Sequence, residues 1–260
     1  MVIAKRSPKT WAILVGIGVV SGYVSGLFGV GGGTIIVPLL LSVAAFDVRL
    51  AHGTSLAAIV PTAIAAVSSY AVGGSVDWIA AALICVGSVT GAQIGSKLLS
   101  SLPKKTIRWI FIAFLCAVIV SMFIVVSNRE SRLTIDVWLG LALAALGLAV
   151  GICSGLLGVG GGIIVVPMLI VVFGASDLIA KGTSLAMMIP TAISGTVGNV
   201  RRKNVDIPAA ACIGLGACAT TWLGAMTAAW VDPFTGNVLF ALFQLAIVIK
   251  MVRDALKKPE

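Results

Sequence analysis

The sequence predicts an all-α polytopic membrane protein with two homologous halves of about five apolar segments each. We expect an inverted-topology repeat with short or broken helices at glycine-rich motifs. Three observations support this: an apolar composition, a gapless internal repeat, and basic loops that change places between the halves. Of the 260 residues, 59% are apolar and 10% are charged. A soluble domain is about 45–50% apolar and about 25% charged, so the composition excludes a cytosolic enzyme, a nucleic-acid-binding domain and a secreted disulfide scaffold.

The internal repeat relates residues 26–41, GLFGVGGGTIIVPLLL, to residues 155–170, GLLGVGGGIIVVPMLI, at an offset of 129 (155 minus 26). The same offset relates GTSLA at 53–57 to GTSLA at 182–186 without a gap. A chance match of this length is not credible, and internal repeats define the architecture of a chain. The sequence therefore predicts two transmembrane repeats, 11–127 and 136–252, that form one integrated domain. Because residues 11–30 align with 140–159, we expect them to be a structural span and not a cleaved signal peptide.

Each half contains five apolar segments. They are 11–30, 34–46, 54–72, 77–99 and 107–127, then 136–158, 163–175, 183–200, 207–230 and 235–252. The long segments match the roughly 20 residues that a helical span needs. The second segment of each half would be near 20 Å long as a helix, which is short for a hydrocarbon core of about 30 Å. A tilted short helix that spans and a half-helix that re-enters both stay open.

The charges of the loops predict the topology. The loop 97–108 is strongly basic, whereas its repeat counterpart near 230–237 carries only Asp232. In the reverse sense, the basic loop 201–206 corresponds to 73–77, which carries only Asp77. If the halves are inverted, all strongly basic loops face the cytoplasm, as the positive-inside rule requires. We therefore expect a multi-pass protein of the plasma (inner) membrane with both termini cytoplasmic, and we interpret the net charge of +9 as a topology signal, with no nucleic acid as partner.

The two GVGGG runs are the leading site candidates. Three successive glycines cost about 1 kcal/mol each in a helix and are suited to an unwound turn. Unwound backbone at membrane depth is tolerated where it lines a cavity or is buried in protein, and the helix that follows presents a positive N-terminal end. Two such ends would form an anion site, although a structural break without ligand contact stays open. The residues expected to bind substrate here are Gly31, Gly32, Gly33, Thr34, Gly160, Gly161 and Gly162.

Further polar residues follow the glycine runs. Thr54 and Ser55, with Thr183 and Ser184, follow a glycine at the start of an apolar run, so we expect helix N-caps whose side chains also face the ligand. Two amides inside spans are secondary candidates, although such amides commonly join helices; these are Gln93 and Asn199. His52, the single histidine, is more readily a bystander than a proton relay.

All nine acidic residues fall in expected loops, ends or the tail. A cationic substrate would lack a counter-charge inside the spans, so the interior favours a small anion, driven by the membrane potential. The five cysteines have no metal-ligand spacing, and we expect no metal, no cofactor and no catalytic residue. A secondary transporter is the leading hypothesis. A passive channel or pore for small anions or solutes is the alternative.

The doubled glycine motif, each copy followed by GTSL and a proline, resembles the TauE/SafE family of sulfite exporters. The resemblance covers nearly the whole chain, and it implies a permease for sulfite, thiosulfate or an organosulfonate in a lipid bilayer. A homo-oligomer stays open. The motif positions that match the family are Gly29, Gly31, Gly32, Gly33 and Pro38, with Gly158, Gly160, Gly161, Gly162 and Pro167.

Overall fold

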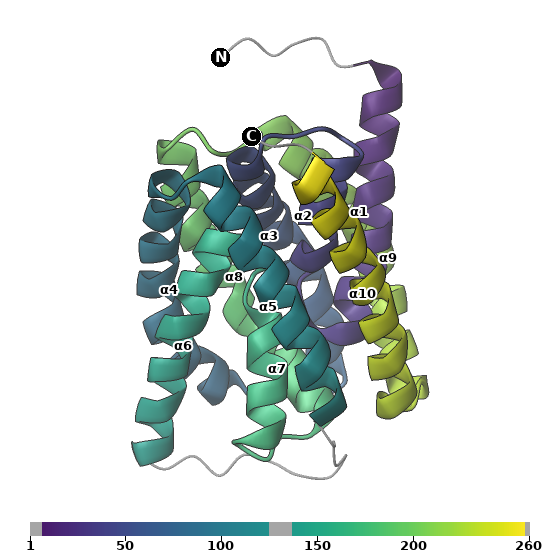
Figure 1. Cartoon of the computed structure of the whole chain (residues 1–260). Helices are drawn as coiled ribbons and strands as arrows, with labels where there is room; N and C mark the ends of the chain where they lie inside the picture. Colours follow the sequence, from purple (N-terminus) through teal and green to yellow (C-terminus); the bar gives the residue numbers. More distant parts are fainter. Residues whose placement is uncertain (1–6, 125–136, 258–260) are drawn as a thin grey trace.

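The computed structural model describes residues 7–124 and 137–257, and these residues form ten α-helices (Figure 1). The first half contributes α1 (Pro8–Phe28), α2 (Gly33–Ser42), α3 (Val48–Val72), α4 (Trp78–Ser101) and α5 (Lys104–Ile124). The second half contributes α6 (Val137–Leu157), α7 (Gly162–Val171), α8 (Asp177–Arg201), α9 (Ile207–Trp230) and α10 (Pro233–Lys257). The all-helical prediction is confirmed. The charged stretch at 129–136 and the first and last few residues lie outside the described part of the chain.

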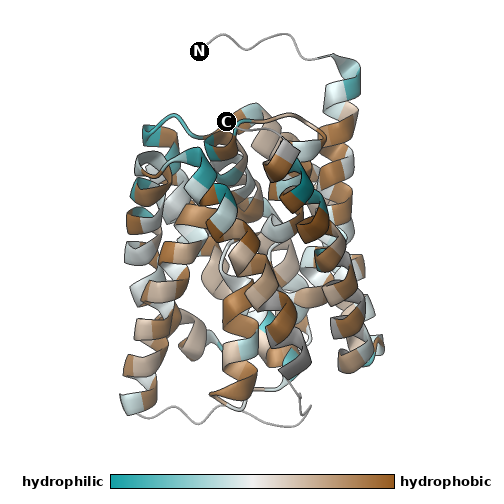
Figure 2. Ribbon diagram, viewed as in Figure 1, coloured by the Kyte–Doolittle hydropathy of each residue, from teal (hydrophilic) through white to brown (hydrophobic). Residues whose placement is uncertain are grey.

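Five helices are long and apolar enough to cross a membrane: α1, α3, α4, residues 138–157 of α6, and α9. Figure 2 shows apolar residues along the flanks of the outer helices and hydrophilic residues gathered mainly at the end where α5 begins and α10 ends. At the opposite end, three tryptophans are exposed where α4 begins, α6 begins and α9 ends: Trp78, Trp138 and Trp230. Exposed tryptophan is typical of the membrane–water interface, so the surface is that of an integral membrane protein.

Glycine ladders hold α1 against α9 and α4 against α6, so each of these close pairs joins one half to the other. A Cβ at Gly18 would lie 2.2 Å from the carbonyl oxygen of Ile213, and a Cβ at Gly22 would lie 2.2 Å from that of Ala217. Only glycine permits such an approach of two backbones. The contacts follow increasing residue number in both helices, so α1 and α9 are parallel. Gly87 and Gly91 repeat the arrangement against Ala144 and Leu148, and α4 is parallel to α6.

The helices α3 and α8 occupy equivalent places in the two repeats and pack together in the centre (Figure 1). Gly182, near the start of α8, lies against Tyr70, near the end of α3. Gly195, near the end of α8, lies against Leu56, near the start of α3. The two equivalent helices therefore run antiparallel.

The two short helices turn back inside the molecule. Each has ten residues, or about 15 Å at 1.5 Å per residue, half of a membrane core of about 30 Å. Residues of α2 pack with the first half of α1 and the starts of α3 and α9, so α2 returns toward the end at which α1 begins (Figure 1). Residues of α7 pack mainly against α8 and share a core cluster with the end of α3 and the start of α4. The prediction of short second helices is confirmed, and each is a half-helix.

The predicted N-caps are wrong. The side chain of Asp47 accepts a hydrogen bond from the N–H of Arg49 and caps α3, and Ser176 caps α8 through the N–H of Ile179. The apolar pattern places the starts of α3 and α8 too late. Polar and charged residues interrupt that pattern in the first turns of both helices, although these turns are helical. The segments expected from 54 and 183 begin at Val48 and Asp177, and the GTSL motifs lie inside the helices.

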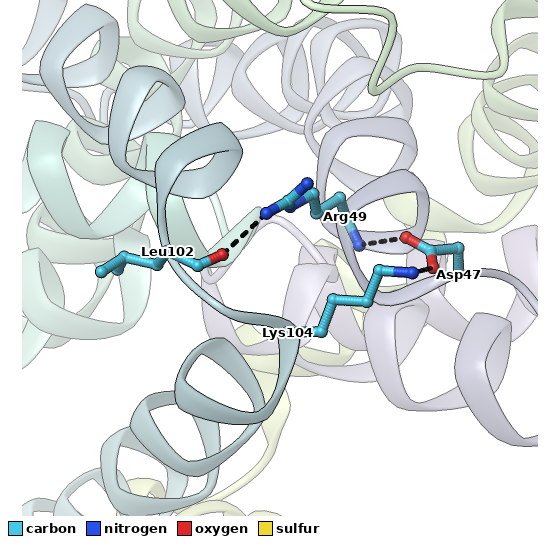
Figure 3. Close-up of polar contacts among 4 residues, drawn as sticks. All are labelled: Asp47, Arg49, Leu102 and Lys104. Carbon is cyan, nitrogen blue, oxygen red and sulfur yellow. Dashed lines mark hydrogen bonds and ion pairs between the residues drawn. The ribbon is translucent and has the colours of Figure 1, made fainter. Parts of the chain in front are cut away.

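Polar contacts tie the α2–α3 loop to the α4–α5 loop (Figure 3). Lys104 pairs with Asp47, and the Arg49 guanidinium donates to the carbonyl of Leu102 at 2.9 Å. The repeat counterparts are Ser176, Leu178, Val231 and Pro233. None of them can form an ion pair, so these contacts make one end of the molecule more polar than the other.

Candidate functional site

Two unwound glycine loops meet in the interior, one between α1 and α2 and one between α6 and α7. Positive φ angles recur at the same three positions of each: +69°, +74° and +73° at Gly29, Gly31 and Gly32, and +65°, +79° and +85° at Gly158, Gly160 and Gly161. Side chains disfavour this left-handed region, so the sequence needs glycine there. Every residue of both loops is buried. A Cβ at Gly33 would lie 2.5 Å from the carbonyl oxygen of Gly158, so the loops are in direct contact.

The loops concentrate unpaired backbone donors. In the described chain, no acceptor contacts the N–H groups of residues 30–34 or 159–163. The next two N–H groups of each short helix return to Gly32 and Gly161. A buried N–H group without a partner costs free energy, and such groups are normally paired. Two sets of donors at the N-termini of α2 and α7 suit an anion, because the helix dipole adds positive potential at the same place.

Serines from the opposite half hold these loops. Ser55 Oγ donates to the carbonyl of Gly158 at 2.7 Å, and Ser184 Oγ donates to the carbonyl of Gly29 at 3.1 Å. With these carbonyls engaged by serine hydroxyls, the neighbouring N–H groups remain the open hydrogen-bonding groups of the loops. The structure thus brings both predicted serines to the glycine motifs, although not as caps of their own helices.

The predicted threonines divide between two places. Thr54 Oγ1 accepts the N–H of Asp206 at 3.0 Å, and Thr183 Oγ1 accepts the N–H of Asp77 at 2.9 Å. They therefore anchor the turns before α9 and α4 and do not face the glycine loops. Thr34 lies in the first turn of α2, fully buried, and within the described chain its Oγ1 has no partner. Thr34 remains a predicted ligand-binding residue.

The two predicted amides differ in whether they have hydrogen-bond partners. Gln93 donates from Nε2 to the carbonyl and to Oγ of Ser194, at 2.5 and 3.0 Å, so it joins α4 to α8. Asn199 is fully buried, and neither its nitrogen nor its oxygen has a partner in the part of the chain that the structure describes. A buried amide in that condition is costly unless a ligand or water binds it. The geometry favours Asn199 over Gln93 as a ligand.

Sequence reasoning missed one symmetric pair of serines. Ser25 and Ser154 occupy equivalent positions just before the glycine motifs, and both are fully buried. Their carbonyls accept the N–H of Gly29 and Gly158, at 2.9 Å in both cases, whereas their hydroxyls contact no acceptor or donor among the described residues. The signal was present, because the same serine precedes GLFGVGGG and GLLGVGGG. We add both hydroxyls to the candidate site.

His52 and Lys181 are repeat counterparts with different partners. The Nδ1 atom of His52 lies 2.7 Å from the carbonyl oxygen of Leu157, and the imidazole meets Phe111 edge-on with ring centroids 5.2 Å apart. Lys181 instead pairs with Asp177 at 2.8 Å and packs its aliphatic stem against Gly29. His52 therefore lies beside the glycine loop of the second half, and Lys181 lies beside that of the first. His52 is inside α3 and not at a loop edge.

One known protein family matches most of this chain. A family model described as sulfite exporter TauE/SafE matches residues 2–122 and 143–260. The chain belongs to the TauE/SafE family. The two matched stretches correspond closely to the two halves defined by the repeat. No solved structure matches this chain.

Curated relatives of this TauE/SafE chain are named as probable membrane transporter proteins. YunE of Bacillus subtilis is 25% identical over 76% of this chain and 81% of its own. A protein of Xylella fastidiosa is 26% identical over 92% of this chain and 94% of its own, and one of Haemophilus influenzae is 27% identical over 90% and 95%. The identities support membership of a membrane transporter family. The names of these relatives do not give a substrate, so the substrate has to be inferred from the site.

The centre of this TauE/SafE site is filled by two apolar side chains, Ile59 from α3 and Met188 from α8. They are repeat counterparts, and both lie between the two glycine loops. Among the described residues, the side chains nearest to both Gly31 and Gly160 are therefore apolar and uncharged.

Proposed function

We propose that this TauE/SafE family protein is a secondary transporter that moves a small sulfur-containing anion, such as sulfite, thiosulfate or an organosulfonate, across the plasma (inner) membrane. The observation that supports this most strongly is the pair of buried glycine loops with unpaired N–H groups. A sulfur oxyanion presents several acceptor oxygens to such donors. Backbone donors fixed in place need no reorganisation when an anion arrives.

The charge distribution points the same way. Asp177 is the one buried acidic residue of the described chain, and Lys181 neutralises it. Burying an anion next to an unpaired carboxylate would be strongly unfavourable. The loops instead combine positive helix ends with neutral hydroxyls, which suits one or two negative charges.

We also infer that the halves are inverted, with both termini in the cytoplasm. The antiparallel course of α3 and α8, which are equivalent in the repeat, supports this, because parallel halves would place equivalent helices in the same direction. The ends of the described chain agree, since the first turn of α1 and the last turns of α10 lie at the same end in Figure 1. That end also carries the basic loops. Inverted repeats of this kind place a substrate site near the bilayer midplane.

A passive pore is the alternative, and the filled centre argues against it. The decisive experiment is flux into proteoliposomes that contain the purified protein, with radiolabelled sulfite, thiosulfate and sulfoacetate offered separately. A membrane potential and a pH gradient are imposed one at a time. A transporter shows saturation and counterflow, and we expect both for at least one of these anions. Linear flux without counterflow would favour a pore, and absence of flux for all three would refute the proposed substrates.

A further inference from the structure

The thioether of Met188 lies between the two glycine loops and touches both. A Cβ placed at Gly31 would lie 1.9 Å from the Met188 Cε atom, and one at Gly160 would lie 2.1 Å from the same atom. A Cβ at Gly162 would lie 2.9 Å from its Sδ atom. One methyl group therefore occupies the space between the central glycines of the two repeats.

Ile59, the repeat counterpart, lines the same space. Its Cγ2 atom would lie 3.4 Å from a Cβ at Gly31 and 3.3 Å from one at Gly160. Both side chains are fully buried. Any anion that passes from one loop to the other must displace one of these two side chains.

The two side chains differ in how easily they move. Isoleucine is β-branched and is held near one χ1 rotamer in a helix. Methionine is unbranched and has three flexible bonds with a polarizable sulfur, so it adapts to irregular spaces. The hydroxyl of Ser184 lies 4.0 Å from the Met188 sulfur, and the same hydroxyl donates to Gly29. Movement of Met188 is thus coupled to the serine that holds a glycine loop.

We propose that Met188 is a specificity-determining residue of the transport step: its thioether seals the passage between the glycine loops, and its displacement sets the size of the anion that passes. This inference rests on the proposed transport function. Ile59 forms the fixed wall and Met188 the movable one. Between the central glycines, the two repeats differ by Ile59 in the first half and Met188 in the second. The glycine runs themselves are nearly identical in sequence and in their φ angles.

The test uses proteoliposomes with Met188→Ala, Met188→Ile and a control, Leu185→Ala. Leu185 lies on the same helix and is fully buried, but none of its atoms is among the three nearest to a Cβ added at any glycine of either loop. Two quantities are measured: passive chloride leak under an imposed potential, and the ratio of sulfoacetate to sulfite transport rates. In Met188→Ala we expect both to rise about tenfold or more, because a truncated core side chain leaves a space that neighbours fill only partly. Leu185→Ala should change neither.

Met188→Ile copies Ile59 into the second half and keeps the core filled. We expect no added chloride leak, because the passage stays sealed, and a several-fold lower sulfite turnover, because the β-branched side chain is held near one rotamer. Unchanged turnover in this variant would overturn the proposal. If Met188→Ala does not fold, this variant decides alone.

The two proposals fail in different ways. If the wild-type protein carries none of the sulfur anions but Met188→Ala leaks chloride, the seal stands and the proposed substrates fall. If the wild type carries sulfite but both Met188 variants leave leak, selectivity and turnover unchanged, the specificity role of Met188 is refuted while the transport function stands.

Discussion

Ser55 donates a hydrogen bond from Oγ to the carbonyl of Gly158 at 2.7 Å, so a residue of the first half holds the glycine loop of the second. Ser184 and Gly29 form the reciprocal contact at 3.1 Å. Neither loop is therefore shaped by its own half alone. The exchange explains why the repeat must be complete before a site exists, and why the GTSL motif follows each glycine run at the same distance.

Ser55→Ala should weaken anion binding without preventing folding. The change leaves the buried Gly158 carbonyl without its donor, at a cost of about 1–3 kcal/mol, and the loop is free to relax. We expect a several-fold rise in the KM of anion flux and a lower melting temperature in detergent. Ser184→Ala should act in the same direction. Ser68→Ala on the same helix is the control, because this exposed hydroxyl bonds only to the carbonyl of Ala65. Equal KM values in all three variants and the wild type would contradict the role of the serines.

Gly32 and Gly161 should tolerate no side chain. Their φ angles of +73° and +85° disfavour any L-residue, at about 1–2 kcal/mol, and a Cβ would lie 2.8 Å from the Ser21 carbonyl oxygen or 2.4 Å from Val150 Cγ1. Replacement by a bulky residue should abolish anion flux while membrane insertion persists. The same bulky replacement at Gly74 or Gly174 is the matched control, since these glycines also have positive φ but no heavy atom within 4 Å of an added Cβ. Flux that survives in the bulky variants of both Gly32 and Gly161 would refute a site at the glycine loops.

The sequence predicts the structure well where a feature depends only on neighbouring residues of the backbone. Three successive glycines cannot form a stable helix face, and the loops at 29–32 and 158–161 follow directly. The start of α3 could not be predicted from hydropathy, because Arg49 and His52 lie in its first two turns and the Asp47 cap fixes where it begins. The sequence also could not show which of the two amide candidates is free to bind a ligand. Gln93 and Asn199 look alike in a sequence, and only the packing of α4 on α8 decides that Gln93 is already bonded.

The ladder glycines should behave differently from the loop glycines. A Cβ at Gly22 would lie 2.2 Å from the Ala217 carbonyl oxygen, and backbone cannot move aside as a flexible side chain does. Gly22→Val should therefore separate α1 from α9 and lower the yield of folded protein severalfold, in addition to stopping flux. Gly16 lies on the same helix and has no heavy atom within 4 Å of an added Cβ. The yield of Gly16→Val should therefore match that of the wild type. Size-exclusion profiles in detergent measure both. Normal yield of Gly22→Val would show that α1 and α9 do not need this close approach.

The ion pair of Asp177 and Lys181 should be strongly coupled. Both side chains are only 10% exposed, so removing one partner leaves a nearly buried charge, which costs about 3–5 kcal/mol for a fully buried pair. Asp177→Asn and Lys181→Met should each lower the melting temperature more than the double variant does. The double-mutant cycle measures the coupling. Additive effects would mean that the two charges are solvated independently. The exposed pair of Lys104 and Asp47 is the control, with coupling of about 1 kcal/mol or less.

The proposed topology makes a last prediction that needs no substrate. The turn at 201–206 is tied to the end of α4 by Arg202, whose guanidinium donates to Ser96 Oγ at 3.0 Å, so two basic loops share one end. Asp77 precedes α4 and Asp232 precedes α10, at the other end of those helices. In a chain with its five cysteines replaced by alanine, a membrane-impermeant thiol reagent added outside cells should label Asp77→Cys and Asp232→Cys. Lys105→Cys, exposed at the basic end, should react only after the membrane is opened. If Asp77→Cys and Lys105→Cys both react from outside, α4 does not cross the membrane and the inverted arrangement is wrong.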